Sequence, residues 1–181
     1  MALPELDLTG LSYAEAAVLA CVSTLRMEGA LESVAEEVGA VEPLRTVGRG
    51  VRTVFAGHLG GERDVATAAK GLSANWRIDQ EIADTHPLAP FWMAGVRVGF
   101  FAFLSVQAAG EERLRECFEQ GREAAGLWPR GVSAGSVGSL LELEVARQEE
   151  SLRVVRRAGV GGLRELAEED RRLFRRVTAS S

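Results

Sequence analysis

Residues 91–109 read FWMAGVRVGFFAFLSVQAA, and this stretch decides the fold class. Apolar residues occupy nearly every position around the helical turn, which is typical of a helix that is buried on all sides. Gly95 and Gly99 are four residues apart, so a neighbouring helix can approach this segment closely. We therefore expect residues 91–109 to form the central buried helix of the protein.

The same stretch is too interrupted to cross a membrane. Arg97 divides residues 89–109 near their middle, and Gln107 lies inside them. The longest uncharged piece, residues 98–110, is too short for a hydrocarbon layer of about 30 Å. The sequence thus favours a helix in a protein core and predicts no membrane partner.

Helical signals continue on both sides of this stretch. Ser12 and Glu15 have the spacing of a capping box at the start of a first helix, which ends at Gly29 or continues to Gly39. Ser139 and Glu142 repeat the pattern. Apolar residues recur with a period near 3.6 in five further segments, namely residues 43–57, 64–85, 111–125, 139–158 and a last helix after residue 162.

No segment alternates in the manner of a half-buried strand between turn signals. The pattern predicts an all-α fold in which residues 1–181 form a single domain. Its architecture is expected to be a helical bundle or an orthogonal helix array of six to eight helices.

Composition favours a globular protein of the cell interior. The chain has 181 residues, of which 46% are hydrophobic and 26% charged, enough apolar side chain to form a core. No segment near the start has the pattern of a signal peptide, and Cys21 and Cys117 lack metal-ligand spacing. We expect both to be free thiols on helix core faces, in a cytoplasmic protein.

Charge is distributed unevenly along the chain. Residues 1–42 hold eight acidic residues and one basic residue, Arg26, so their net charge is −7. The net charge of the whole chain is −5, so the remaining residues sum to +2. The last helix ends with four arginines: Arg171, Arg172, Arg175 and Arg176. Complementary ends suit self-association that weakens with salt, and they suit pairing within one chain equally well.

The arginines also suggest a phosphate-binding surface. Arg45, Arg49 and Arg52 are expected on one polar helix face, and the arginines of the last helix could contact a nucleic-acid backbone in the same way. Aromatic side chains for base stacking are scarce, with one tyrosine in the chain. Acidic residues interleave with the arginines of the last helix, as on an ordinary solvated face: Glu165, Glu168, Glu169 and Asp170.

Residues for catalysis are few. His58 is expected to be a core residue on an apolar helix face, whereas Asp79, Asp84, His86 and Arg97 form a candidate enzyme site around the turn at residues 86–90. Asp79 and Arg97 would either pair in the interior or both reach solvent. No metal-ligand spacing, nucleophile arrangement or phosphate-loop motif accompanies them, the small-residue loop at residues 131–138 included.

These observations favour a non-enzymatic helical subunit that acts through protein–protein contacts and needs no cofactor, and a second copy of itself is one candidate partner. The first alternative is a subunit of a nucleoprotein complex that binds the backbone through arginines. The second is an enzyme with its site near Asp79, Asp84, His86 and Arg97. The sequence identifies neither the partner nor the pathway.

Overall fold

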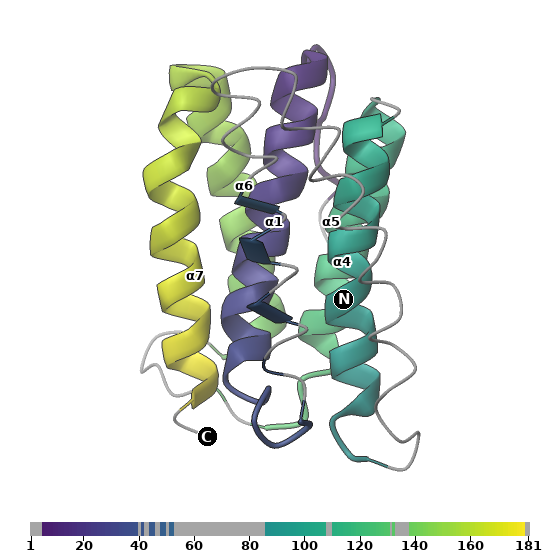
Figure 1. The fold of residues 1–181 in the computed structure, drawn as a ribbon. Helices are drawn as coiled ribbons and strands as arrows, with labels where there is room; N and C mark the ends of the chain where they lie inside the picture. Colours follow the sequence, from purple (N-terminus) through teal and green to yellow (C-terminus); the bar gives the residue numbers. More distant parts are fainter. Residues whose placement is uncertain are drawn as a thin grey trace.

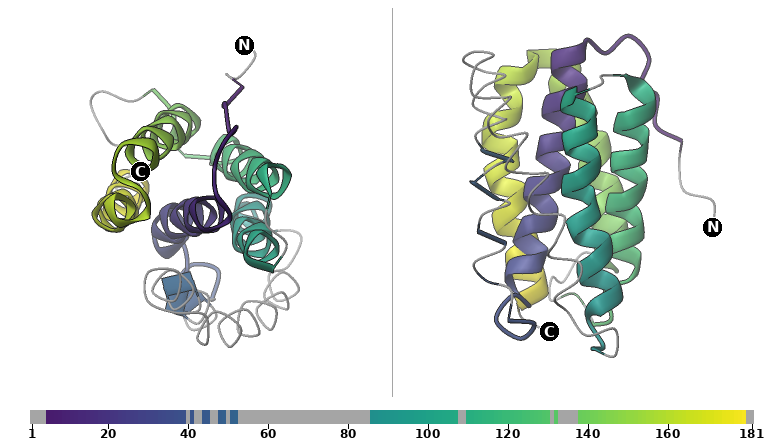
Figure 2. Two further views of the ribbon diagram at one scale, coloured as in Figure 1. Left: turned by 90° about the horizontal axis from the view of Figure 1, so that it is seen from above. Right: turned by 45° about the vertical axis from the view of Figure 1, so that its right-hand side comes forward.

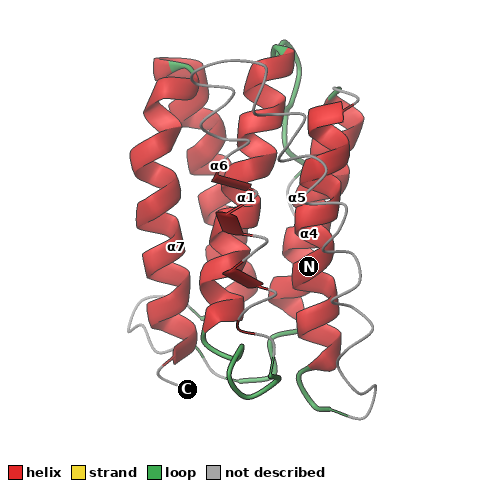
Figure 3. Cartoon of the chain, in the orientation of Figure 1, coloured by secondary structure: helices red, strands yellow, loops and turns green. Residues whose placement is uncertain are grey.

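The computed structural model describes residues 5–39, 41, 44–45, 48–49, 51–52, 86–107, 110–130, 132 and 138–179. Within this part of the chain there are five α-helices and one turn of 3-10 helix, and Figure 3 shows no strand there. The elements are α1 (Tyr13–Glu32), α4 (Ala89–Gln107), α5 (Glu111–Gly126), α6 (Leu140–Ala158), η2 (Val160–Gly162) and α7 (Leu163–Ala179). The all-α prediction is confirmed.

The helices run side by side as a bundle, with α1 in the middle (Figure 1). Seen along the axis in Figure 2, α4 and α5 lie on one side of α1, and α6 and α7 lie on the other. α1 contacts all four of these helices. Each of them also contacts the next along the chain.

Two sequence-based expectations need correction. The structure describes five helices with defined bounds, not six to eight. The segment expected at residues 64–85 lies outside the described residues. In and next to the segment expected at residues 43–57, seven positions are described, namely residues 41, 44–45, 48–49 and 51–52. The central helix is α1, not α4. Met93, Arg97, Phe100 and Leu104 make a half-buried line along α4, so this helix is not buried on all sides.

α1 is central because its polar side chains are paired, so the whole surface of the helix can be buried. Ser12 caps it through the expected capping box: the Ser12 backbone N–H donates to Glu15 at 2.8 Å, and Ser12 Oγ accepts from the Glu15 N–H at 3.3 Å. Every residue from Ala16 to Leu31 is buried, including charged ones. The helix passes through Gly29 without a break and ends at Glu32.

Gly29 is needed for the close approach of α1 and α7. A Cβ atom added at Gly29 would lie 2.1 Å from the backbone oxygen of Arg171, a distance that real contacts do not reach. Gly95 plays a similar part on α4, where a Cβ would lie 2.9 Å from Leu31 Cδ2, as the sequence suggested. The close packing of α1 against α7 and against α4 therefore depends on glycine at these two positions.

We expect Gly29→Ala to lower the free energy of unfolding by about 1–3 kcal/mol, since α7 must move away from α1 to make room. Gly161→Ala is the matched control, because nothing lies within 4 Å of a Cβ at that position. Urea denaturation of both variants measures the difference. Equal stabilities would mean that α7 is not held against Gly29 in solution.

The aromatic core differs in part from the expectation. Trp92 is fully buried, as expected, but Phe100 and Leu104 are only half-buried, and the Phe103 side chain lies outside what the structure describes. Phe91, Phe118, Trp128 and Phe174 complete the buried aromatic set of the described residues, and Phe91 packs edge-to-face on Trp128 at 4.8 Å between ring centres. The core therefore extends around α1 and does not centre on α4.

Among the described helices none has the length and apolarity to span a bilayer. The most apolar one, α4, includes Arg97 near its middle.

Both cysteines are free thiols and both are buried, as expected. Cys117 Sγ lies 3.8 Å from the Ala20 carbonyl oxygen and 3.7 Å from that of Val98, so it is enclosed by α1, α4 and α5. Burial raises the pKa of Cys21 to about 12. It also raises the pKa of Cys117.

Thiol labelling at mildly alkaline pH should therefore be slow in the folded protein and fast in urea, because the reactive thiolate forms only far above that pH. The labelling rate of native and unfolded chain with an aromatic disulfide reagent is the measurement. Fast labelling of the native chain would show that α1 and α5 separate readily.

Candidate functional site

The most unusual feature of the bundle is an arginine buried at its centre. Arg26 on α1 is completely inaccessible to solvent, and so are the two acids that face it, Glu144 on α6 and Asp170 on α7. Arg26 Nε donates to Glu144 Oε2 at 3.0 Å, and one terminal nitrogen donates to Asp170 Oδ2 at 2.8 Å. We call Arg26, Glu144 and Asp170 the buried triad.

The rest of the Arg26 guanidinium is also hydrogen-bonded. The nitrogen that donates to Asp170 also donates to Ser151 Oγ at 2.9 Å, and the other terminal nitrogen donates to Ser23 Oγ at 3.1 Å. These groups come from α1, α6 and α7. One side chain thereby connects three helices.

The triad is surrounded by a second layer of polar groups. Gln148 donates to Glu144 Oε1 at 2.7 Å and to the Phe118 carbonyl oxygen at 2.9 Å, and Arg122 donates to Gln148 Oε1 at 2.7 Å. Arg147 pairs with Asp170, and reaches Glu169 at 3.1 Å. The network thus extends to α5 on one side and to the surface on the other.

Burial dominates the electrostatics of the triad. Desolvation raises the pKa of Glu144, although the charge of Arg26 and the hydrogen bond from Gln148 act in the opposite direction. The pKa of Arg26 is also raised: desolvation opposes its charge, but Glu144 and Asp170 together outweigh that effect. Isolated buried charges are costly, so this arrangement requires all its members.

The buried triad does not have the access that a catalytic site needs. None of its three side chains has surface in contact with solvent, so a substrate cannot reach them in the closed bundle. Gly121 on α5 seals the acid side, since a Cβ there would lie 2.9 Å from Glu144 Oε1. The chemistry of the triad is therefore that of a specific connection between helices.

A second ionic cluster lies further along α1. Glu28 accepts two hydrogen bonds from Arg52, at 3.0 and 2.7 Å, and Arg171 Nε lies 3.4 Å from Glu28 Oε2. Arg171 also pairs with Glu32, and Arg175 Nε lies 3.7 Å from the same carboxylate. Burial raises the pKa of Glu28 against the lowering effect of Arg52 and Arg171.

This cluster explains the uneven charge of the sequence. Five of the eight acids before residue 43 pair with arginines that come later in the same chain: Glu5 with Arg115, Asp7 with Arg156, Glu28 with Arg52 and Arg171, Glu32 with Arg171 and Arg175, and Glu37 with Arg130. The acidic beginning and basic end thus meet within one molecule. The charge asymmetry by itself no longer calls for a second copy.

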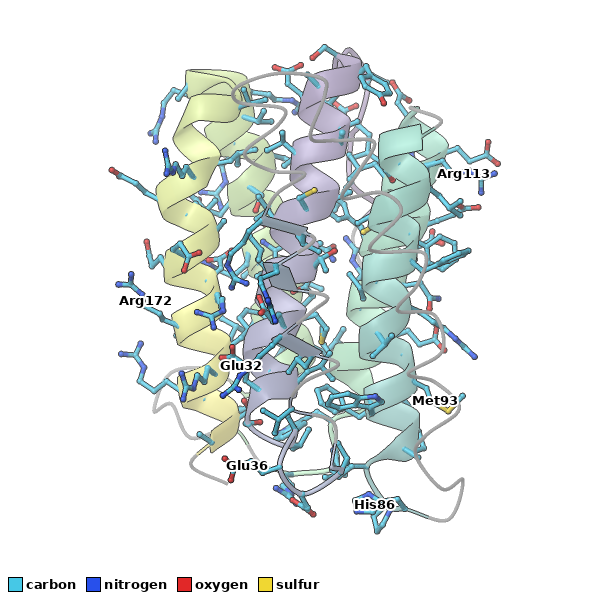
Figure 4. All side chains as sticks on the ribbon, in the orientation of Figure 1. Glu32, Glu36, His86, Met93, Arg113 and Arg172 are labelled. Carbon is cyan, nitrogen blue, oxygen red and sulfur yellow. The ribbon has the colours of Figure 1, made fainter. Side chains whose placement is uncertain are left out.

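The predicted arginine surface is divided by these contacts. Arg52 and Arg171 are half-buried and paired with Glu28, instead of lying on an open polar face. Arg45, Arg49, Arg172, Arg175 and Arg176 are exposed. Figure 4 shows Arg172 pointing away from α7 toward solvent.

Asp170 was expected on the solvated face of the last helix, and this is wrong. It is fully buried, because it lies between Arg26 and Arg147.

The candidate enzyme residues are not assembled in the described part of the chain. His86 lies at one end of the bundle (Figure 4), where its Nδ1 accepts from the Leu88 N–H at 3.2 Å. Arg97 is half-buried eight residues into α4, roughly 12 Å further along the helix axis. Asp79, Asp84 and His58 lie outside the described residues.

The outer face of α7 is open to solvent and hollowed. A shallow hollow of about 710 Å³ lies there, lined by Arg164, Glu165, Glu168, Glu169, Arg172, Leu173 and Arg176. Positions 165, 169, 172 and 176 follow one line along the helix, opposite the buried Phe174. We call Glu165, Glu169, Arg172 and Arg176 the α7 stripe.

Two further sequence features can be placed only in part. Ser139 caps α6, with Oγ accepting from the Glu142 N–H at 3.1 Å, while most of the loop at residues 131–138 lies outside the described residues. Within the described residues no three metal-ligating side chains gather. No protein-family model, curated protein or solved structure matches the chain.

Proposed function

We propose that this chain is a non-enzymatic helical subunit that works through protein–protein contact, with the outer face of α7 as its contact surface. The observation that carries the proposal is the division of the charged side chains. Those around α1 are buried in internal connections, whereas the four side chains of the α7 stripe are exposed beside a shallow hollow, and Glu169 among them also contacts Arg147 of the same chain.

The internal use of charge speaks against a reactive site in the described residues. Arg26, Glu144 and Asp170 are sealed, and Glu28 is held by Arg52 and Arg171. A general acid or base must reach the group whose proton it moves, and these side chains have no such access. Rigid bundles with an outward helix face are suited to recognition instead.

The pattern on α7 favours a protein partner over nucleic acid. A phosphate backbone requires cations without competing acids, but Glu165, Glu168 and Glu169 lie beside Arg164 and Arg172. Mixed charges are instead complementary to another mixed surface, where they set orientation and register. Arg45 and Arg49 remain exposed for the nucleoprotein alternative, which the experiment below separates.

The test is the size of the particle that contains the chain in its own cells. A tagged chain in nuclease-treated extract should elute well above the 19.4-kDa monomer, and Glu165→Arg/Glu169→Arg, which makes the α7 stripe wholly basic, should shift it toward the monomer. Arg113→Glu/Glu116→Arg, which reverses a half-buried pair on α5, is the control and should leave the size unchanged. A monomer in untreated extract would refute the proposal. A large particle that nuclease dissolves would establish the nucleoprotein alternative.

A further inference from the structure

The α7 stripe has an order of charges that fits a second copy of itself. Its four members run acid, acid, base, base along one line of the helix: Glu165, Glu169, Arg172 and Arg176. The spacings of four, three and four residues are symmetric about the midpoint between Glu169 and Arg172. An antiparallel copy placed against this line therefore meets it with opposite charges at every position.

We propose that two copies of this chain pair through α7 in antiparallel orientation about a two-fold axis. Glu165 then faces Arg176 of the other copy, and Glu169 faces Arg172, so the symmetric contact has four ion pairs. In a parallel arrangement each charge would face its own kind, which is repulsive. The charge order alone thus selects the antiparallel dimer.

The surroundings of the stripe are compatible with this contact. Glu165, Glu169, Arg172 and Arg176 are all exposed, and the half-buried Leu173 lies at the edge of the same hollow as an apolar contact. Glu169 is oriented by Arg147, which binds its Oε1 at 3.1 Å from within the same chain. Its second carboxylate oxygen is left for a cation from the partner.

The position of α7 also leaves room for a second molecule. α7 lies at the edge of the described helices when they are seen from above (Figure 2, left), and its inner side is fixed to α1 and α6 through Asp170, which pairs with Arg26 and Arg147. The stripe therefore sits on a rigid support. Since the contact uses one helix and exposed ion pairs, the dimer is expected to be weak and sensitive to salt.

The inference deepens the proposed function by naming its partner as a second copy, and it rests on that function. It is independent of the acidic beginning of the chain, whose charges are used internally. It therefore replaces the head-to-tail association that the overall charge asymmetry suggested. Substitution of Arg171 or Arg175 would also disturb the internal ion pairs of Glu28 and Glu32. The variants below therefore leave Arg171 and Arg175 unchanged.

Sedimentation velocity over a protein concentration series is the first measurement. At about 50 mM salt the chain should form dimers at high concentration, and the dissociation constant should rise at least about tenfold by roughly 500 mM salt. Glu165→Arg/Glu169→Arg makes the stripe wholly basic, and Arg172→Glu/Arg176→Glu makes it wholly acidic. Each variant alone should stay monomeric, and an equimolar mixture should form heterodimers.

The fourfold variant that exchanges all four charges should recover the homodimer, since its order of base, base, acid, acid still places opposite charges face to face in an antiparallel pair. Arg113→Glu/Glu116→Arg on α5 is the control and should dimerise as the unchanged chain does. Thermal melting of each variant confirms that it is folded. Dimerisation that the reversals leave unchanged, or a mixture that stays monomeric, overturns the inference.

Orientation is tested by oxidation. Chains carrying Glu165→Cys, mixed with chains carrying Arg176→Cys, should form a mixed disulfide dimer, while Glu165→Cys alone should not link to itself; the native cysteines are buried and do not interfere. Self-linking of Glu165→Cys would indicate a parallel pair and overturn the geometry. The two proposals can fail separately. If the purified chain is monomeric at every salt concentration while the particle in cell extract is large and depends on the α7 stripe, the dimer is refuted and the proposed function stands.

Discussion

Arg26→Met is expected to lower the free energy of unfolding near neutral pH by about 3–5 kcal/mol, the largest effect of any polar substitution in the described residues. Methionine fills most of the space that arginine occupies, so the loss comes mainly from charge. Glu144 would be left without its cation in a place that water does not reach, and Asp170 would keep only Arg147. Urea denaturation measures the change.

The loss should depend on pH in a direction that identifies its cause. Without Arg26, desolvation raises the folded-state pKa of Glu144 above the ordinary value of 4.5 with less opposition. The folded variant then binds a proton more tightly than the unfolded chain does. Its deficit relative to the unchanged protein should therefore be smallest near pH 4.5 and grow as pH rises toward neutrality.

Two further variants isolate the effect. Arg26→Met/Glu144→Gln should recover part of the lost stability, because the uncompensated carboxylate is gone. Arg153→Met is the control, since Arg153 on α6 is 69% exposed and should contribute under about 1 kcal/mol. If Arg26→Met is as stable as the unchanged protein at neutral pH, the triad is not buried as described.

Trp92→Ala is expected to cost about 3–5 kcal/mol, the largest loss among the apolar side chains of α4. Trp92 is fully buried and its Nε1 has no hydrogen-bond partner among the described residues, so the loss is mainly one of packing. A small apolar hollow already lies beside it, lined in part by Leu31, Leu44 and Gly95. Removal of the indole would enlarge this hollow into a true cavity.

Phe100→Ala is the matched comparison on the same helix. Phe100 is half-buried, so its loss should be about 1–2 kcal/mol, below the amount that a fully buried phenylalanine would lose. Chemical denaturation of the two variants under one set of conditions gives both values. Equal losses would mean that the half-buried line on α4 is covered in solution.

The helices could be predicted because their signals are local. Ser12 with Glu15 marks the start of α1, and Ser139 marks that of α6, through hydrogen bonds that span three residues. Apolar spacing gave α5 and α7 within a few residues of their observed bounds. Such features are encoded within a turn or two and need no knowledge of the rest of the fold.

The central position of α1 could not be predicted, because it depends on pairing between distant residues. Arg26 interrupts an apolar surface just as Arg97 interrupts α4, yet only Arg26 meets two buried acids. A charged residue inside an apolar run either pairs with an opposite charge in the interior or lies where the helix meets solvent. A single sequence does not distinguish these two cases. Asp170 gave no signal, since it stands among charged neighbours that are exposed.

The partners of Arg26 stand 118 and 144 residues later in the chain, a separation with consequences for synthesis. When α1 leaves the ribosome, its arginine has no buried acid to pair with until α6 and α7 have been translated, although α4 and α5 can pack against other parts of its surface before then. The chain therefore cannot mature helix by helix, and most of it must be made before its centre is protected. Nascent chains stalled before residue 170 should bind chaperones, although α1 itself has been complete for most of translation.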